Sequence, residues 1–303
     1  MADSSLPVVA GVDHRWVDVD GVRLHVAEAG TEHRSERPSV VLLHGWPQHW
    51  FCWRHVIPAL ATTHHEVAVD LRGAGWSDAP AGPAAYDKRA IADEIARLVE
   101  VMGLDRPVLV GHDWGAWTSL LVASRHPGRV RGVVAAAIIA PWTPVPWYDL
   151  WRFGYQLVAA GPWGPFLHRG LGQVFLRTIF RLGASRRFRW SRADREEYLA
   201  RFRDPARARA GALMYRRFLS TEIAATLRRA YARRVDDVPL LLLPGQADGV
   251  LAPRIVRQAA GPTNVVVREI AGAGHWVPEE QPEALVRHVR AFLDRLRRAE
   301  PDE

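Results

Sequence analysis

The chain is poor in cysteine and has no long apolar run. Cys52 is the only cysteine in 303 residues, which excludes an internal disulfide and favours a reducing compartment. No stretch reaches the roughly 18 apolar residues of a membrane span, and residues 1–7 lack the basic and then apolar pattern of an export signal. We therefore expect a cytoplasmic protein with no membrane partner.

Lysine is almost absent as well, although the chain is basic. The formal net charge is +7 with a pI near 10.2, yet Lys88 is the only lysine and every other basic residue in that count is arginine. Such a one-sided choice is typical of a bias in coding composition. The arginines are scattered, apart from a cluster between Arg181 and Arg192, and no recognition motif accompanies them. The charge predicts a solvated basic surface and no nucleic-acid partner.

The alternation of apolar segments predicts an α/β sheet. Two alternating runs on either side of Asp20-Gly21 indicate an antiparallel hairpin at a sheet edge. Beyond it, short apolar strands alternate with amphipathic helices, as in a mostly parallel central sheet flanked by helices. We expect strands at 40–43, 67–70, 108–110, 130–137, 239–244 and 265–270, and helices at 53–61, 90–102, 116–125 and 282–298.

The character of the chain changes after residue 140. Residues 141–234 are rich in Trp, Phe and Arg and have helical periodicity with little strand pattern. A helical insert between two strands of one sheet is most simply a lid. The sequence therefore predicts a core formed by residues 1–140 and 235–303, and a helical cap at 141–234 inserted after the sixth strand.

One stretch has the pattern of a nucleophile elbow. The apolar run at 108–110 leads into Gly111-His112-Asp113-Trp114-Gly115, and a helical pattern follows. In such a strand–turn–helix segment, a sharp turn lifts one side chain above a parallel sheet. The serine that is usual at this turn is absent, and Asp113 stands in its place.

Two further residues complete a possible triad. Asp248 and His275 each follow a predicted strand, and the chain order of nucleophile, acid and histidine is that of α/β hydrolases. All three lie just past the carboxyl ends of strands, where open parallel sheets place their sites. Singly, Asp113 and Asp248 are also explained as helix or turn caps, and His275 as a loop histidine. Together, they predict a catalytic triad.

The segment His44-Gly45-Trp46-Pro47 is suited to an oxyanion-hole loop. The amide of Trp46, together with that of Trp114, would supply the two donors. The alternative is an ordinary turn between strand and loop. A carboxylate at the elbow is already ionised and attacks a saturated carbon to give an ester, which leaves the histidine to activate a water. Asp113 therefore predicts hydrolysis at an sp³ carbon.

On these residues, the chain resembles the epoxide hydrolases of the α/β hydrolase fold. The resemblance extends from about residue 14 to about residue 296. The motifs that carry it are His44-Gly-Trp-Pro47, Asp70-Leu-Arg-Gly-Ala-Gly-Trp-Ser-Asp78, Gly111-His-Asp-Trp-Gly115 and Gly274-His-Trp276. The same motifs are similar to those of haloalkane dehalogenases, so both substrates stay open at this point.

The resemblance implies two cap tyrosines as proton donors. An epoxide oxygen leaves as a poor alkoxide, and epoxide hydrolases of this type protonate it with two lid tyrosines. Phe153-Gly-Tyr155 and Met214-Tyr215 are similar to the two motifs, which implies Tyr155 and Tyr215. The alternative is that both pack an aromatic-rich lid.

The resemblance also implies the reactants and the residues that contact them. A small apolar epoxide and water would give a vicinal diol, without a metal or an organic cofactor. The residues expected to bind substrate are His44, Pro47, Trp114, Gln156 and Trp276. A homodimer is one option for the oligomeric state.

Two alternatives differ in function. A haloalkane dehalogenase would use Asp113 in the same way, with an indole N–H such as that of Trp114 holding the departing halide. Haloalkane dehalogenases often carry asparagine where this chain has Trp46. A non-catalytic member of the fold is the other alternative, because a fold does not determine a function.

Overall fold

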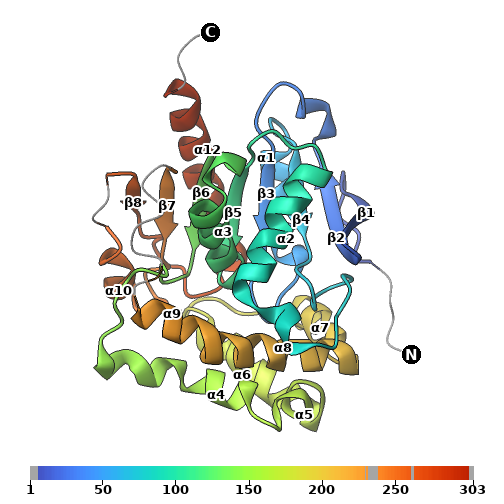
Figure 1. Cartoon of the computed structure of the whole chain (residues 1–303), viewed down its shortest axis with the longest axis vertical. Helices are drawn as coiled ribbons and strands as arrows, with labels where there is room; N and C mark the ends of the chain where they lie inside the picture. Colours follow the sequence, from blue (N-terminus) through green and yellow to red (C-terminus); the bar gives the residue numbers. More distant parts are fainter. Residues whose placement is uncertain (1–5, 229, 231–237, 261–262, 300–303) are drawn as a thin grey trace.

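The described residues form one eight-stranded sheet. The computed structural model describes residues 6–228, 230, 238–260 and 263–299, and Figure 1 shows the whole chain. The sheet order is β1-β2-β4-β3-β5-β6-β7-β8. The pairs β1–β2 and β2–β4 are antiparallel, and all others are parallel. The strands are β1 (Asp13–Val19), β2 (Val22–Ala29), β3 (Val40–Leu43), β4 (Glu66–Val69), β5 (Val108–His112), β6 (Gly132–Ala136), β7 (Leu240–Leu243) and β8 (Val265–Val267).

Helices cover both faces of the sheet, as Figure 1 shows. On one face lie α2 (Lys88–Val101) and α3 (Trp114–Arg125), and behind the sheet lie α1 (Ile57–Leu60) and α12 (Pro282–Arg298). Every residue of β3, β5, β6 and β7 is buried between these layers. Apart from His112 at the end of β5, their sequences are apolar, which this double burial explains. The remaining core helices are α10 (Pro253–Arg257) and α11 (Val277–Glu280), with short 3₁₀ turns η1 (Thr31–His33), η2 (Trp50–Trp53), η3 (Pro83–Tyr86) and η4 (Pro127–Arg129).

The predicted architecture is confirmed, with two local differences. The hairpin across Asp20-Gly21 forms and lies at the sheet edge, as expected. The single helix expected at 53–61 is wrong, because the chain forms η2 and then α1 there. Pro58 explains the break: it lacks the N–H that a continuous helix needs and lies instead in the first turn of α1. The last strand ends at Val267, and beyond it only an isolated bridge joins Gly245 to Ile270.

Between β6 and β7 the described chain is helical and contains no strand. Figure 1 shows this segment, which we call the cap, as a layer across one end of the sheet. Its elements are η5 (Trp147–Phe153), α4 (Gly154–Ala160), α5 (Gly164–Arg169), η6 (Leu171–Gln173), α6 (Val174–Gly183), α7 (Arg192–Arg201), α8 (Pro205–Arg217), the π-helical turn η7 (Phe218–Glu222) and α9 (Ile223–Leu227). The expected end of the cap at residue 234 lies outside the described residues. None of the described helices is long and apolar enough to cross a bilayer.

Close backbone contact at Gly115 joins the elbow to the sheet. A Cβ atom on Gly115 would lie 2.0 Å from the carbonyl oxygen of Leu43, at the end of β3. The first turn of α3 therefore rests directly on the neighbouring strand. Because the obstacle is backbone, a side chain at this position cannot be accommodated by a change of rotamer.

We predict that Gly115→Ala is strongly destabilising. The added methyl group must push α3 away from β3, so we expect the free energy of unfolding to fall by about 3 kcal/mol, at the upper end of overpacking effects. Urea denaturation followed by circular dichroism measures this change. Gly128→Ala is the matched control, because its Cβ meets no atom within 4 Å and should change stability by only about 0.5 kcal/mol. Equal losses in the two variants would contradict the role of the close contact.

Candidate functional site

Asp113 lies at a sharp turn between β5 and α3. Its backbone has φ 49° and ψ −119°, in a region that residues other than glycine rarely adopt. Its N–H donates to the carbonyl of Ala136 on β6 (3.0 Å), and its Oδ2 accepts from the N–H of Trp46 (3.0 Å). Strain of this kind persists where the surroundings hold it and is common at functional sites.

One backbone amide binds the Asp113 carboxylate, and a second is available at the start of α3. A Cβ on Gly45 would lie 2.7 Å from Asp113 Oδ2, so only glycine leaves room for the carboxylate to reach the amide of Trp46. Trp114 is the first residue of α3, and the N–H groups at a helix start have no intrahelical partner. The loop at 44–47 and the helix start therefore supply the two amides that the sequence singled out.

His275 lies between Asp113 and Asp248. Its Nδ1 is 3.0 Å from Asp248 Oδ2, and its Nε2 is 3.7 Å from Asp113 Oδ1. Because a carboxylate can only accept, Nδ1 carries a proton. The other oxygen of Asp248 accepts from the N–H groups of Val250 (2.7 Å) and Leu251 (2.8 Å). The structure thus brings together three residues whose outermost members, Asp113 and His275, are 162 positions apart in the sequence.

The charges of this group stabilise one another. Burial favours the neutral form of His275, but the charge and the hydrogen bond of Asp248 and the nearby charge of Asp113 outweigh it and raise the pKa of His275 to about 10. Burial likewise favours the neutral form of Asp113, but the charge of His275 and the hydrogen bond from the Trp46 amide lower the pKa of Asp113 below its ordinary value. The resting site is therefore an imidazolium between two carboxylates.

Two residues without a predicted role hold the His275 loop. His112 donates through Nε2 to the carbonyl of His275 (2.8 Å), and burial lowers the pKa of His112 to about 4. Glu280 accepts from the N–H groups of Gly274 (2.9 Å) and Trp276 (3.0 Å), and from that of Ser185 in the cap (2.9 Å). No sequence motif distinguishes Glu280, because a glutamate near a helix start is common.

Tyr155 and Tyr215 come together beneath the cap. Tyr155 is in the first turn of α4 and Tyr215 in α8, with ring centroids 5.9 Å apart. The Tyr215 ring also packs edge-on against Trp46 (4.9 Å) and Trp114 (5.5 Å). Burial, reinforced by the charge of Asp113, raises the pKa of both phenols above the ordinary tyrosine value. Both tyrosines are therefore protonated and close to the elbow.

The other residues expected at the site differ in placement. Gln156 is buried and shares a side-chain hydrogen bond with Tyr155. Trp276 is buried, with its ring edge-on to His275 (5.0 Å) and its indole N–H donated to Phe180 of α6 (2.9 Å). Trp276 therefore supports the histidine from the cap side.

His44 lies behind the amide loop that it precedes. Its Nδ1 donates to the carbonyl of Gly45 (2.8 Å), and its Nε2 accepts from the N–H of Leu71 (3.0 Å). Both ring nitrogens are thus engaged by backbone, so His44 positions the loop and has none left for a substrate. Pro47 follows Trp46 through a cis peptide bond in the same loop.

A buried cluster around Glu279 joins the cap to the core. Glu279 Oε1 accepts from Arg54 Nη1 (2.9 Å), from Gln48 Nε2 (3.3 Å) and from the hydroxyl of Tyr198 on α7. Burial raises the pKa of Glu279 above its ordinary value, although Arg54 opposes this. Glu279, at the centre of the cluster, follows His275 by four residues.

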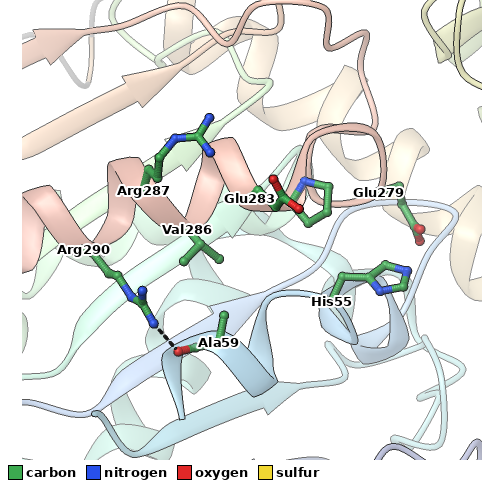
Figure 2. Close-up of a pocket in the computed structure, with 8 residues that line it drawn as sticks. His55, Ala59, Glu279, Glu283, Val286, Arg287 and Arg290 are labelled. Carbon is green, nitrogen blue, oxygen red and sulfur yellow. Dashed lines mark hydrogen bonds between the residues drawn. The ribbon is translucent and has the colours of Figure 1, made fainter. Parts of the chain in front are cut away.

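A cavity of about 600 Å³ lies on the outer side of this cluster, away from the elbow. Figure 2 shows Arg290 of α12 hydrogen-bonded to the Ala59 carbonyl, whereas the Arg287 side chain points away from Ala59 and His55. The lining contains Glu279 but no residue of the Asp113 group. Among the described residues, no three His, Cys, Asp or Glu side chains are grouped to hold a metal ion. The chemistry of the side chains therefore selects the elbow as the site.

The raised pKa of His275 links stability to pH. The ordinary value is 6.5 and the folded value about 10, so the folded state binds this proton more tightly. The stabilisation is fully present below pH 6.5 and is lost as the pH rises to about 10. We predict that the difference in unfolding free energy between the wild type and His275→Gln shrinks by at least ~1.4 kcal/mol, one pKa unit, over this range. Urea titrations at several pH values measure it, and a constant difference would count against the charged triad.

Comparison with known proteins places the chain in a family. A family model described as the alpha/beta hydrolase fold matches residues 38–282. The chain is 32% identical to epoxide hydrolase A of Mycobacterium tuberculosis over 93% of this chain and 97% of that protein. It is 25% identical to epoxide hydrolase 1 of Caenorhabditis elegans over 95% of this chain and 72% of that protein.

Solved structures are similar over nearly the whole chain. Cfl2 from Burkholderia cenocepacia shares 32% identity at a TM-score of 0.80, covering 93% of this chain and 96% of that one. The epoxide hydrolase CorEH shares 27% identity at a TM-score of 0.80, covering 94% of this chain and 99% of that one. The similarity therefore includes the core and the cap.

Proposed function

The chain belongs to the α/β hydrolase fold family, among its epoxide hydrolases, and on that premise we propose that it hydrolyses a small apolar epoxide to a vicinal diol. The observation that carries the proposal is a buried, ionised Asp113 close to two protonated phenols, the partly buried Tyr155 and the buried Tyr215. A carboxylate nucleophile with acids near it is the combination that ring opening of an epoxide requires.

In the first step, Asp113 attacks one ring carbon and the C–O bond of the epoxide breaks. A covalent ester forms on the Asp113 carboxylate, and the ring oxygen takes a proton from Tyr155 or Tyr215. The phenols suit this role because burial keeps them protonated at neutral pH. The indole of Trp114, which packs against Tyr215, forms part of the surrounding apolar wall.

In the second step, His275 activates a water that attacks the ester carbonyl. Ester formation removes the negative charge of Asp113, which is one of the causes that raise the pKa of His275. The imidazolium then releases its proton and becomes a base, and this proton balances the one delivered to the ring oxygen. The tetrahedral oxyanion is stabilised by the amides of Trp46 and Trp114, and its collapse releases the diol and restores the carboxylate.

The alternative is a haloalkane dehalogenase with the same nucleophile. One observation favours it: the indole N–H of Trp46 is buried with no hydrogen-bond partner among the described residues, and that of Trp114 is buried beside the Tyr215 hydroxyl. Two such donors can hold a departing halide, which needs no proton. The two functions are therefore separated by whether the phenol protons are needed.

We predict that the first turnover transfers an oxygen from the enzyme to the diol. In a single turnover in H₂¹⁸O, the new diol oxygen comes from the Asp113 carboxylate and is unlabelled, whereas the label enters Asp113. Mass spectrometry of the diol and of the peptide containing Asp113 measures both. A labelled diol and an unlabelled peptide would mean that water opens the ring directly.

We predict that Tyr155→Phe and Tyr215→Phe separate the two candidate functions. Epoxide opening should slow by about 10²-fold or more in the double variant, the range of a general acid, whereas any dehalogenation should persist. Turnover of styrene-type and terminal epoxides and of 1-haloalkanes measures this. Tyr148→Phe is the control, because Tyr148 is 56% exposed on η5. Undiminished epoxide turnover in the double variant would remove the tyrosines from the mechanism.

A further inference from the structure

The only lysine of the chain is buried beside the elbow. Lys88 is the first residue of α2 and is 1% exposed. Its ammonium nitrogen lies 3.8 Å from the centre of the Trp114 indole ring. Within the described part of the chain, no hydrogen bond and no ion pair shorter than 4 Å reaches this ammonium group. A buried cation whose direct contact is an aromatic face is unusual, since burying a charge without a partner is unfavourable.

The choice of lysine at this position is informative. Lysine and arginine together number 40, and all but Lys88 are arginine. Arginine stays charged in proteins, whereas a buried lysine is a compact charge that can lose its proton. A chain that uses arginine at every other basic position and lysine at this one therefore retains a cation that can titrate.

The charges around Lys88 come from three elements. The elbow contributes Asp113, the cap contributes Glu222 of η7, and the start of α2 contributes Asp87. Burial lowers the pKa of Lys88 from 10.5 to about 7, although these three carboxylates oppose the shift. The charge of Lys88 thus changes near neutral pH and depends on the charge of Asp113.

Two arginines complete these surroundings. Arg217 of α8 donates to Asp87 (2.9 Å), and Arg89 lies 3.9 Å from Glu222. Asp87 and Glu222 are therefore shared with other cations. Asp113, by contrast, loses its negative charge whenever the proposed ester forms. Of the carboxylates that act on Lys88, Asp113 is the one whose charge changes during turnover.

Trp114 connects Lys88 to the proposed chemistry. The ammonium group lies over its indole ring. The ring also makes T-shaped contacts with Tyr215 and Phe218, with centroid distances of 5.5 and 4.6 Å. Trp114 also directly follows Asp113 and carries one of the two amides proposed to stabilise the oxyanion. A cation held on an aromatic face restrains the ring, and it does so only while it is protonated.

We propose that Lys88 is a positioning residue of the nucleophile elbow, whose ammonium group holds the Trp114 ring in place and responds to the charge of Asp113. This inference rests on the proposed epoxide hydrolysis for its kinetic consequence. In the charged form, Lys88 keeps Trp114 and Tyr215 ordered for ring opening. Loss of its proton releases Trp114 and slows ester formation.

The charge coupling is testable without a substrate. Because the chain has one lysine, protein labelled with [¹³Cε]lysine gives a single lysine NMR signal. We expect this signal to titrate near pH 7 in the wild type and about one unit lower in Asp113→Asn, since a neighbouring negative charge has been removed. Glu100→Gln, which neutralises an exposed carboxylate on the same helix as Lys88, is the control and should leave the titration unchanged. Titration at the ordinary lysine value near 10.4, or no response to Asp113→Asn, overturns the proposal.

The kinetic consequence is tested with three variants. For wild type, the single-turnover rate of ester formation should fall as the pH rises above about 7. Lys88→Met should be about 10-fold slower at pH 6 and lack this fall, whereas Lys88→Arg should stay within about 3-fold of wild type and keep its rate at higher pH. Arg97→Met removes an exposed charge from the same helix and should behave as wild type.

Identical pH profiles for wild type and Lys88→Arg would overturn the positioning role. If Lys88→Met does not fold, the Lys88→Arg profile and the NMR titration still decide. If no epoxide is turned over at all, the proposed function fails, and the NMR response to Asp113→Asn then supports or overturns the charge coupling by itself.

Discussion

The backbone of Asp113 is the constraint on which the rest of the site depends. Its φ of 49° is unfavourable for an aspartate, and the surrounding contacts hold it there. Gly115 lets the start of α3 rest on β3, and Gly45 leaves space for the carboxylate to reach the amide of Trp46. A relaxed backbone would lower the carboxylate into the sheet and away from His275. The position of the Asp113 carboxylate therefore depends on the packing of α3 and of the loop at 44–47 against the end of the sheet.

In the proposed reaction, the charges of Asp113 and His275 change together and return to their starting values. His275 lies between two carboxylates, and in the proposed mechanism one of them becomes neutral when the ester forms. The histidine then turns from an acid into a base without a conformational change. The same loss of charge reaches Lys88 on the far side of Trp114. Two cations with opposite tasks thus respond to a single event, which explains why so many ionisable groups are buried in a small volume.

Much of this arrangement is predictable from the sequence. Apolar runs of four or five residues predict the central strands because those strands are buried on both faces, and the elbow is recognisable because its glycines are imposed by backbone contact. The break between η2 and α1, within the helix expected at 53–61, is missed because Pro58 starts a helix as readily as it ends one. His44 and Trp276 stand in motifs, but the backbone carbonyls and amide that they bind are visible only in the structure. Lys88 stands out in the sequence as the only lysine, but its burial against Trp114 and the contact of Glu280 with the cap at Ser185 are visible only in the fold.

The Glu279 cluster has a consequence for how such enzymes diversify. The hydroxyl of Tyr198 in the cap donates to Glu279 of the core, which also binds Arg54 and Gln48. The cap amide of Ser185 donates to Glu280. Both carboxylates immediately follow the His275 loop. A cap inherited from another relative by recombination would leave these acids without their partners and disturb the histidine directly. The cap and the histidine loop are therefore expected to change together in evolution, although about 75 residues separate Tyr198 from His275 in the chain.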